Sequence, residues 1–183
     1  MTANISNSAQ GTTESAQLNH QMEQVSDIDL WSVRMADSCM KRQPVLADRW
    51  GYESGVVLKG IEQVWLDTGN KKYLEYIKRN IEQLVQPDGS IRTYNPQDYD
   101  LDQINTGKLL FRLYQKTGDK RYQQALHLLM GQLKTQPRTS EGGFWHKKIY
   151  SYQMWLDGIY MAAPFYVQYA DCFDETSGFD DAV

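Results

Sequence analysis

A six-residue segment occurs twice in this chain, and its spacing limits the possible folds more than any other feature. Thr-Gly-Asn-Lys-Lys-Tyr at 68–73 returns as Thr-Gly-Asp-Lys-Arg-Tyr at 117–122, which is 49 residues later. Three glycines, Gly55, Gly107 and Gly158, follow one another at similar intervals of 52 and 51 residues. A period near 50 residues with two helices in each period indicates an array of helical hairpins.

Apolar residues between these repeats recur at helical spacing. The expected helices span about 27–43, 54–68, 72–85, 105–117, 120–135 and 156–170, with a Pro-Asp-Gly-Ser turn at 87–90. Asp27 or Asp29 is the expected N-cap of the first helix. Because no run of alternating β-branched residues recurs, the chain is predicted to be all-α.

Two architectures use such hairpins, an open α-solenoid and a closed toroid whose inner helices surround a cleft. The period exceeds the roughly 34 residues of a tetratricopeptide unit, and the extra length lies in the loops before the glycine-bearing helices. Functional residues are often found on such loops, which favours the toroid. The chain has room for about three hairpins. It is therefore predicted to be a helical-hairpin array that forms about half of an (α/α)6 barrel.

The array is expected to cover residues 27–183, after a flexible leader at 1–26 that is rich in Ser, Thr, Asn and Gln. No capping helix is evident in the acidic tail after Cys172. A half-ring would expose the apolar faces of its inner helices. Self-association, or a missing C-terminal half, is expected for that reason.

The composition excludes several classes of function. A net charge of −4 gives no sign of the basic face that a nucleic-acid-binding module carries. The leader has neither an apolar core nor a positively charged start, so no signal peptide, membrane span or membrane partner is expected. Cys39 and Cys172 form no CxxC motif and are interpreted as reduced thiols, which makes the cytoplasm the default location.

Candidate site residues gather in the loops before the three glycines. If Gly55, Gly107 and Gly158 mark equivalent helix starts, these loops open at the same end of the ring and their side chains converge. The residues concerned are Trp50, Tyr52, Asp102, Asn105, Trp145, His146, Trp155 and Asp157. They supply two carboxylates and several aromatic surfaces, and the adjacent Lys147 and Lys148 offer positive charge to an anionic substrate.

Asp157 is the first candidate for catalysis because it lies in an otherwise apolar run, where a carboxylate is costly to bury. General acid catalysis at neutral pH needs a raised carboxyl pKa, which apolar surroundings and a second carboxylate favour. The alternative is that Asp157 is the N-cap of the helix that contains Gly158, and composition alone favours the cap. Asp102 is likewise either the second active-site carboxylate or a cap for the helix expected at Asn105.

The aromatic and histidine candidates also have two interpretations. His146 contacts a substrate or shuttles a proton, or it is a structural hydrogen-bonding residue. Trp145 and Trp155 stack on sugar rings, or they pack in the core. The sequence contains no HExxH, CxxC, GxSxG or GxxxxGK[ST] motif, and its three histidines have no metal-ligand spacing. No metal ion or other cofactor is therefore expected.

Five segments carry a resemblance to a known family. They are Trp-Ser-Val-Arg-Met-Ala-Asp-Ser at 31–38, Trp-Gly-Tyr-Glu-Ser-Gly at 50–55, Asp-Gln-Ile-Asn-Thr-Gly-Lys-Leu-Leu at 102–110, Pro-Arg-Thr-Ser-Glu-Gly-Gly-Phe-Trp-His-Lys at 137–147 and Gln-Met-Trp-Leu-Asp-Gly-Ile-Tyr-Met at 153–161. With them the chain resembles glycoside hydrolase family 105, the unsaturated rhamnogalacturonyl hydrolases. The resemblance implies an (α/α)6 barrel that acts on unsaturated galacturonic acid linked to rhamnose, as left by pectin lyases.

The resemblance also implies roles for the candidate residues. Asp157 is similar to the family's general acid/base and Asp102 to its second active-site aspartate. His146 and Trp155 match positions that line the sugar subsite, and the loop at 50–53 faces that subsite. The implied reaction begins with protonation of C4 of the C4=C5 vinyl ether by Asp157. Water then adds at C5 with help from either carboxylate, and the hemiketal collapses to release the sugar.

Two features depart from the family pattern. Ser151 stands between Tyr150 and Tyr152 where a proline is expected. Family members are also longer, and further substrate-binding residues follow the part that this chain matches. Two alternatives therefore remain beside the rhamnogalacturonyl hydrolase: an unsaturated glucuronyl hydrolase of other uronides, and a truncated, inactive helical-repeat protein.

Overall fold

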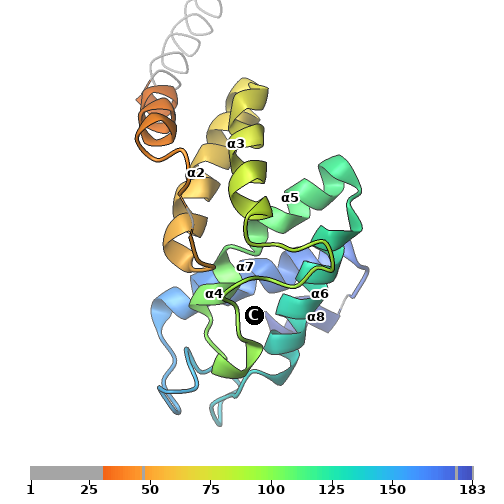
Figure 1. Ribbon diagram of the computed structural model, residues 1–183. Coiled ribbons are helices and arrows are strands. Elements are labelled where there is room, and N and C mark those ends of the chain that lie inside the picture. The colour runs from red at the N-terminus through yellow and green to blue at the C-terminus, as the bar shows by residue number, and fades with distance from the viewer. Residues whose placement is uncertain (1–30, 47, 176, 183) are drawn as a thin grey trace, which may run out of the picture.

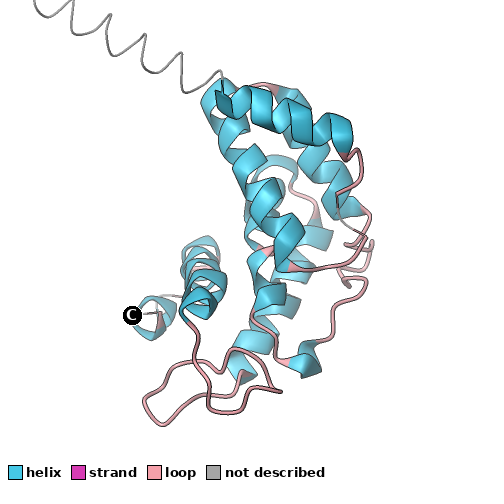
Figure 2. Cartoon of the chain, turned by 90° about the vertical axis from the view of Figure 1, so that its left-hand side faces the viewer, coloured by secondary structure: helices cyan, strands magenta, loops and turns pink. Residues whose placement is uncertain are grey.

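The computed structural model describes residues 31–46, 48–175 and 177–182, which are helical and contain no strand. A first helix covers 31–42. It is followed by α2 (Tyr52–Thr68), α3 (Lys71–Glu82), the 3-10 turn η1 (Pro96–Asp98), α4 (Asp102–Asn105), α5 (Lys108–Thr117), α6 (Lys120–Thr135), α7 (Leu156–Cys172) and α8 (Ser177–Asp181). Figure 1 shows α3 beside α2 and α6 beside α5, and Figure 2 shows helices joined by loops. The all-α prediction is confirmed. The expected leader and the N-caps at 27 and 29 lie outside the described residues.

The repeated six-residue segment closes two hairpins in the same way. Gly69 and Gly118 have positive φ angles of 66° and 68° and end α2 and α5 as left-handed C-caps. The following residue, Asn70 or Asp119, accepts a hydrogen bond from the backbone N–H two positions further on and so caps the next helix. The same local chemistry therefore turns α2 into α3 and α5 into α6.

The helix expected over 105–117 is divided into α4 and α5. At this junction the N–H groups of Gly107 and Leu109 bond to carbonyls three residues earlier, which is the tighter pattern of a 3-10 turn. The Thr106 hydroxyl meanwhile donates to the Gly51 carbonyl at 2.7 Å. This contact with a segment far away in the sequence accompanies the break, which the helical spacing of the sequence did not predict.

The absence of a capping helix after Cys172 was a wrong expectation, because the tail forms the short helix α8 against α7. Ion pairs attach the tail to the rest of the array. Lys134 of α6 lies 3.0 Å from Glu175, and Arg138 lies 2.5 Å from Asp181. The tail carries little apolar periodicity, so its helix could not be read from hydrophobic spacing.

At each of the three repeated glycines another segment of the chain approaches the backbone closely. A Cβ added at Gly55 would lie 2.2 Å from Thr106 Oγ1, and one at Gly107 would lie 2.5 Å from Leu129 Cδ1. A Cβ at Gly158 would lie 3.0 Å from His146 Nδ1 and 3.3 Å from Leu101 Cδ1. Helix α4 thus touches the first turns of both α2 and α7. The three glycine-bearing segments adjoin, as their spacing predicted.

Large apolar side chains remain exposed on two of these helices. On α2 and α7 they are Val56, Val57, Leu66, Leu156, Ile159, Tyr160 and Val167. Exposure of this kind is expected of an array that forms part of a ring. Self-association through this surface stays a prediction. In the described part of the chain no helix has both the length and the apolar character that crossing a bilayer requires.

Replacing Gly55 by alanine is expected to lower the free energy of unfolding by about 1–3 kcal/mol. The added Cβ would meet the Thr106 side chain and also lie 3.0 Å from Thr106 Cα, which cannot move without moving the backbone. Gly60→Ala in the same helix is the matched control, because its Cβ would meet nothing within 4 Å. That control should gain about 0.5–1 kcal/mol from helix propensity. Urea denaturation measures both, and a Gly55→Ala protein as stable as Gly60→Ala would contradict the close contact.

Candidate active site

His146 ties together the loops that lead into α4 and α7. Its backbone N–H donates to Gln153 O at 2.8 Å, and its carbonyl accepts from Leu101 N at 3.0 Å. The side-chain amide of Gln136 at the end of α6 donates to Tyr99 O at 2.7 Å and to Trp145 O at 2.9 Å. These contacts fix two loops that are separated in sequence, so that residues just before α4 and residues between α6 and α7 share one site.

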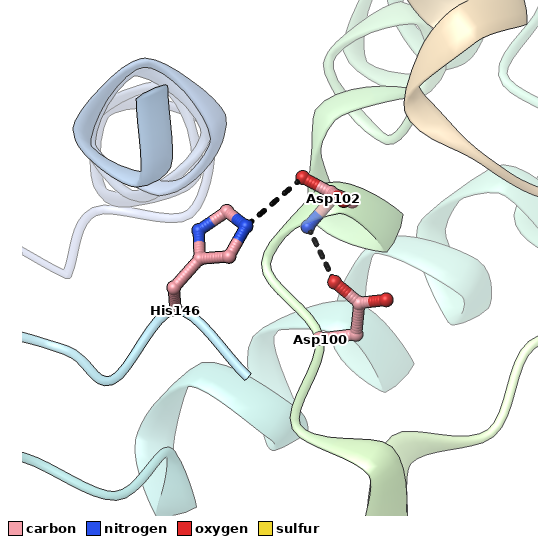
Figure 3. Close-up of side chains that lie close together, drawn as sticks. All are labelled: Asp100, Asp102 and His146. Atoms are coloured by element: carbon pink, nitrogen blue, oxygen red, sulfur yellow. Dashed lines mark hydrogen bonds and ion pairs between the residues drawn. The ribbon is translucent and has the colours of Figure 1, made fainter. Parts of the chain in front are cut away.

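Asp100, Asp102, His146 and Lys147 form a cluster at this junction, and Figure 3 shows the first three of them. Lys147 Nζ lies 2.6 Å from Asp102 Oδ2 and 3.2 Å from Asp100 Oδ2. His146 Nε2 lies 3.4 Å from Asp102 Oδ1. The Asp102 backbone N–H also donates to Asp100 Oδ1 at 3.0 Å, which closes a local turn. Asp102 is therefore held from two sides, by an ammonium group and by an imidazole.

Burial and neighbouring charges both shift the pKa values of Asp100 and Lys147. Burial raises the pKa of Asp100, and the charge of Asp102 adds to that rise, while Lys147 acts against it. Burial alone would lower the pKa of Lys147, but its ion pairs with Asp102 and Asp100 outweigh burial and raise that pKa. The positive charge of Lys147 thus offsets the negative charges of two carboxylates. Removing Lys147 would leave both carboxylates without this cation.

His146 is almost fully buried and lies against an aromatic ring. Only 1% of it is exposed, and its ring stacks on Trp155 with centroids 4.5 Å apart and an angle of 9°. Trp155 also stacks with Tyr150 at 4.9 Å, yet keeps 39% of its surface exposed. Nδ1 of His146 has no hydrogen-bond partner among the described residues, and it faces Gly158. The imidazole is held by stacking and by its Nε2 contact with Asp102.

Asp100, Asp102 and His146 bring three potential ligand atoms within 4.8 Å of one another. Carboxylate and imidazole groups are common metal ligands. Here, however, the Lys147 ammonium already contacts both carboxylates. A metal ion at this position would have to displace that ammonium group.

Asp157 is the second residue of α7, and Trp155 occupies the N-cap position without a side-chain capping bond. The interpretation of Asp157 as an N-cap is therefore wrong. Its side chain is exposed, as are those of Leu156 and Ile159. The apolar enclosure expected around this carboxylate is not formed by these neighbours. Asp102 is not an N-cap either, because Leu101 holds that position before α4.

The remaining candidates differ in how much of them a ligand could reach. Trp50 is 3% exposed and donates from Nε1 to Gln103 O at 2.6 Å, and Asn105 is fully buried with Nδ2 3.4 Å from Tyr52 O. Both brace α4 against the start of α2. Tyr52 is 39% exposed, and Trp145 is half-buried against Tyr152 at 4.6 Å.

A cavity of about 490 Å³ lies beside this cluster, between the 138–144 loop, α7 and α8. Its lining includes apolar side chains such as Phe144, Met154 and Tyr166, together with the ion-paired Arg138. Among the predicted site residues, Trp155 alone lines it within the described part of the chain. Neither Asp102 nor Asp157 lines this cavity.

Comparison with known proteins places the chain in a family. The family model described as Glycosyl Hydrolase Family 88 matches residues 31–183. The chain belongs to glycosyl hydrolase family 88. It is also similar to the solved structure of a family 105 glycoside hydrolase from C. acetobutylicum ATCC 824, with 43% identity, a TM-score of 0.80 and 83% of this chain covered. The resemblance to family 105 and the partial helical-barrel fold are confirmed. The match covers 42% of that protein, so this family 88 chain spans less than half of its length.

Sequence reasoning missed how Asp100 and Lys147 act together in this family 88 chain. Asp100 was not among the candidate residues, and Lys147 was noted only as one of two adjacent lysines. The spacing of Asp100 and Asp102 is a signal for a side-chain-to-backbone turn. Their pairing with Lys147 carries no local signal, because 45 residues separate Asp102 from Lys147.

Replacing Lys147 by methionine should lower the free energy of unfolding by about 2 kcal/mol, somewhat less than the loss of a fully buried partner. The two carboxylates would face each other without their shared cation. Lys148→Met is the matched control, since Lys148 is exposed and its amine makes only distant contacts, with Gln97 O at 3.5 Å and the Tyr99 ring at 5.7 Å. That variant should stay within about 0.5 kcal/mol of the parent. Equal losses for the two lysines in urea titrations would argue against the cluster.

Asp100→Asn should change how stability depends on pH. Because the native pKa of Asp100 lies above its ordinary value of 3.8, the native state holds this proton more tightly than the unfolded chain does. The parent therefore loses stability relative to the Asn variant as pH rises through and above that value. At lower pH both states are protonated and the difference disappears. Denaturation from about pH 3 to about pH 7 measures this effect, and a parent that gains stability over the variant across this range would contradict the raised pKa.

Proposed function

We propose that this chain carries part of the active site of a hydrolase that removes unsaturated galacturonic acid from rhamnose-linked pectin oligosaccharides. The observation that supports it best is the junction of α4 and α7. There the exposed Asp157 lies in a helical turn that packs, through Gly158, against His146 and Leu101. Asp102, the residue after Leu101, is held by Lys147 and His146. Two carboxylates in different surroundings are the usual requirement for acid–base chemistry on a sugar.

In the proposed reaction the substrate is a vinyl ether, with its double bond between C4 and C5. Asp157 is exposed and forms no ion pair with another described residue. In this proposal it donates a proton to C4. Positive charge then develops at C5 and on the ring oxygen. Water adds at C5 and gives up a proton to a carboxylate, which restores the protonation state. The resulting hemiketal opens to a ketone, and the bond to the neighbouring sugar is then lost. Both proton transfers are general acid–base steps.

Asp102 has a different role in this proposal. Its contacts with Lys147 and His146 hold it in one orientation, so it orients the water molecule or a sugar hydroxyl. The exposed part of Trp155 offers an apolar surface to a sugar ring, and Tyr52 contributes another. Trp145 contacts the sugar next to the reacting one. Trp50 and Asn105 are buried and do not contact the sugar in this proposal. Their role is to hold α4, and with it Asp102, in place.

The test follows the vinyl-ether absorbance of unsaturated galacturonyl-rhamnose with the parent chain and with Asp157→Asn. The variant should lose about 10²- to 10⁴-fold in kcat/KM. Asp171→Asn is the matched control, because Asp171 is an exposed acid near the other end of the same helix. It should keep the parent rate. No loss of absorbance with a well-folded parent would count against the proposal and favour an inactive helical-repeat protein.

A parallel measurement with an unsaturated glucuronyl disaccharide addresses the substrate class. Faster turnover of that compound would replace the rhamnogalacturonyl substrate by another uronide while leaving the chemistry of Asp157 in place.

A further inference from the structure

Helix α7 contains a proline in its interior. Pro164 lies within Leu156–Cys172, where a carbonyl before the last turn normally accepts a hydrogen bond from the N–H four residues later. Proline has no N–H group, so it cannot donate to the carbonyl of Tyr160. That carbonyl lies at the end of the first turn of α7, the turn that carries Asp157. Without another donor this turn would be joined less firmly to the rest of the helix.

A lysine from another helix supplies a donor to this carbonyl. Lys108 is the first residue of α5, and its Nζ lies 3.1 Å from Tyr160 O. The same ammonium group lies 3.7 Å from the centroid of the Tyr160 ring, within the range of a cation–π contact. Lys108 is only 4% exposed. The side chain thus makes two contacts with one residue of α7.

The electrostatic surroundings of Lys108 are otherwise unfavourable. No carboxylate among the described residues forms an ion pair with it. Lys59 of α2, whose charge acts on Lys108, is itself paired with Glu62. Burial lowers the pKa of Lys108 to about 8, and the charge of Lys59 adds to the effect. The N-terminal end of α5 also disfavours a cation. Burying an ammonium group without a carboxylate partner costs free energy. The contacts with Tyr160 of α7 are what offset this cost.

We propose that Lys108 replaces the hydrogen bond that Pro164 removes from α7 and thereby fixes the first turn of α7 to α5. Lys108 is then a positioning residue for Asp157. This consequence for catalysis rests on the proposed function, whereas the coupling between the two positions is a property of the fold.

A double-mutant cycle tests the coupling in the full chain. Pro164→Ala returns an N–H to Tyr160 O, which should make Lys108 dispensable. Lys108→Met is therefore expected to lower the thermal midpoint by about 2–8 °C more in the parent than in the Pro164→Ala background. Lys59→Met is the matched control, because its amine bonds to Glu62 and not to α7. It should have the same effect in both backgrounds. Equal effects of Lys108→Met in the two backgrounds would overturn the proposal, and Lys108→Gln serves in the same cycle if the methionine variant does not fold.

Two local measurements separate positioning from general stability. Hydrogen exchange of the amides at 158–162 should become faster in Lys108→Met and return toward the parent rate when Pro164→Ala is added. If the parent is active, kcat should fall in Lys108→Met with KM little changed, and Pro164→Ala should restore it. Unchanged exchange and unchanged kcat would refute the positioning role. An inactive parent would count against the proposed function alone, since the cycle and the exchange rates do not depend on turnover.

Discussion

The close approach of neighbouring segments at three glycines is the constraint on which the rest of this structure depends. Gly55 lets α2 reach the Thr106 backbone, Gly107 lies against Leu129 and Phe165, and Gly158 lies against His146. A larger residue at any of these positions would separate helix ends that now touch. Because loops enter the helices at these same ends, the glycines decide which loops meet. The regular spacing of three residues without side chains thus determines where functional groups can gather.

Once the loops meet, backbone hydrogen bonds and one lysine decide how the site is ordered. His146 bonds through its backbone to both Leu101 and Gln153, so these backbone bonds position the residue independently of its side-chain contacts. Lys147, the next residue, then reaches Asp100 and Asp102 from the opposite loop. The cluster compensates its own charge locally. This explains how two acids can be largely withdrawn from water at a junction of loops, where few apolar side chains are available to fill the space.

Periodic and local features of this fold could be predicted from the sequence, and features that depend on distant contacts could not. The Thr-Gly-Asn and Thr-Gly-Asp segments predicted two hairpins. They could do so because the hydrogen bonds of each turn join residues within the segment itself. The division between α4 and α5 was missed because it accompanies the bond from Thr106 to Gly51, 55 residues away. The alternative of a cap at Asp157 was also wrong. The helix begins at Leu156 as expected, but Trp155 holds the N-cap position, so Asp157 lies inside the first turn.

The contrast between Asp102 and Asp157 gives the site its chemical asymmetry. Asp102 is withdrawn from water and held by Lys147 and His146, so it stays close to one position. Asp157 lies on an exposed turn whose carbonyl end is secured by Lys108 from another helix. In the proposed reaction the first acid orients and the second exchanges protons. The substrate ring would itself cover Asp157 and exclude water from it. Exposure in the free chain is then consistent with a carboxylate that acts on a bound sugar, provided that the turn beneath it does not move.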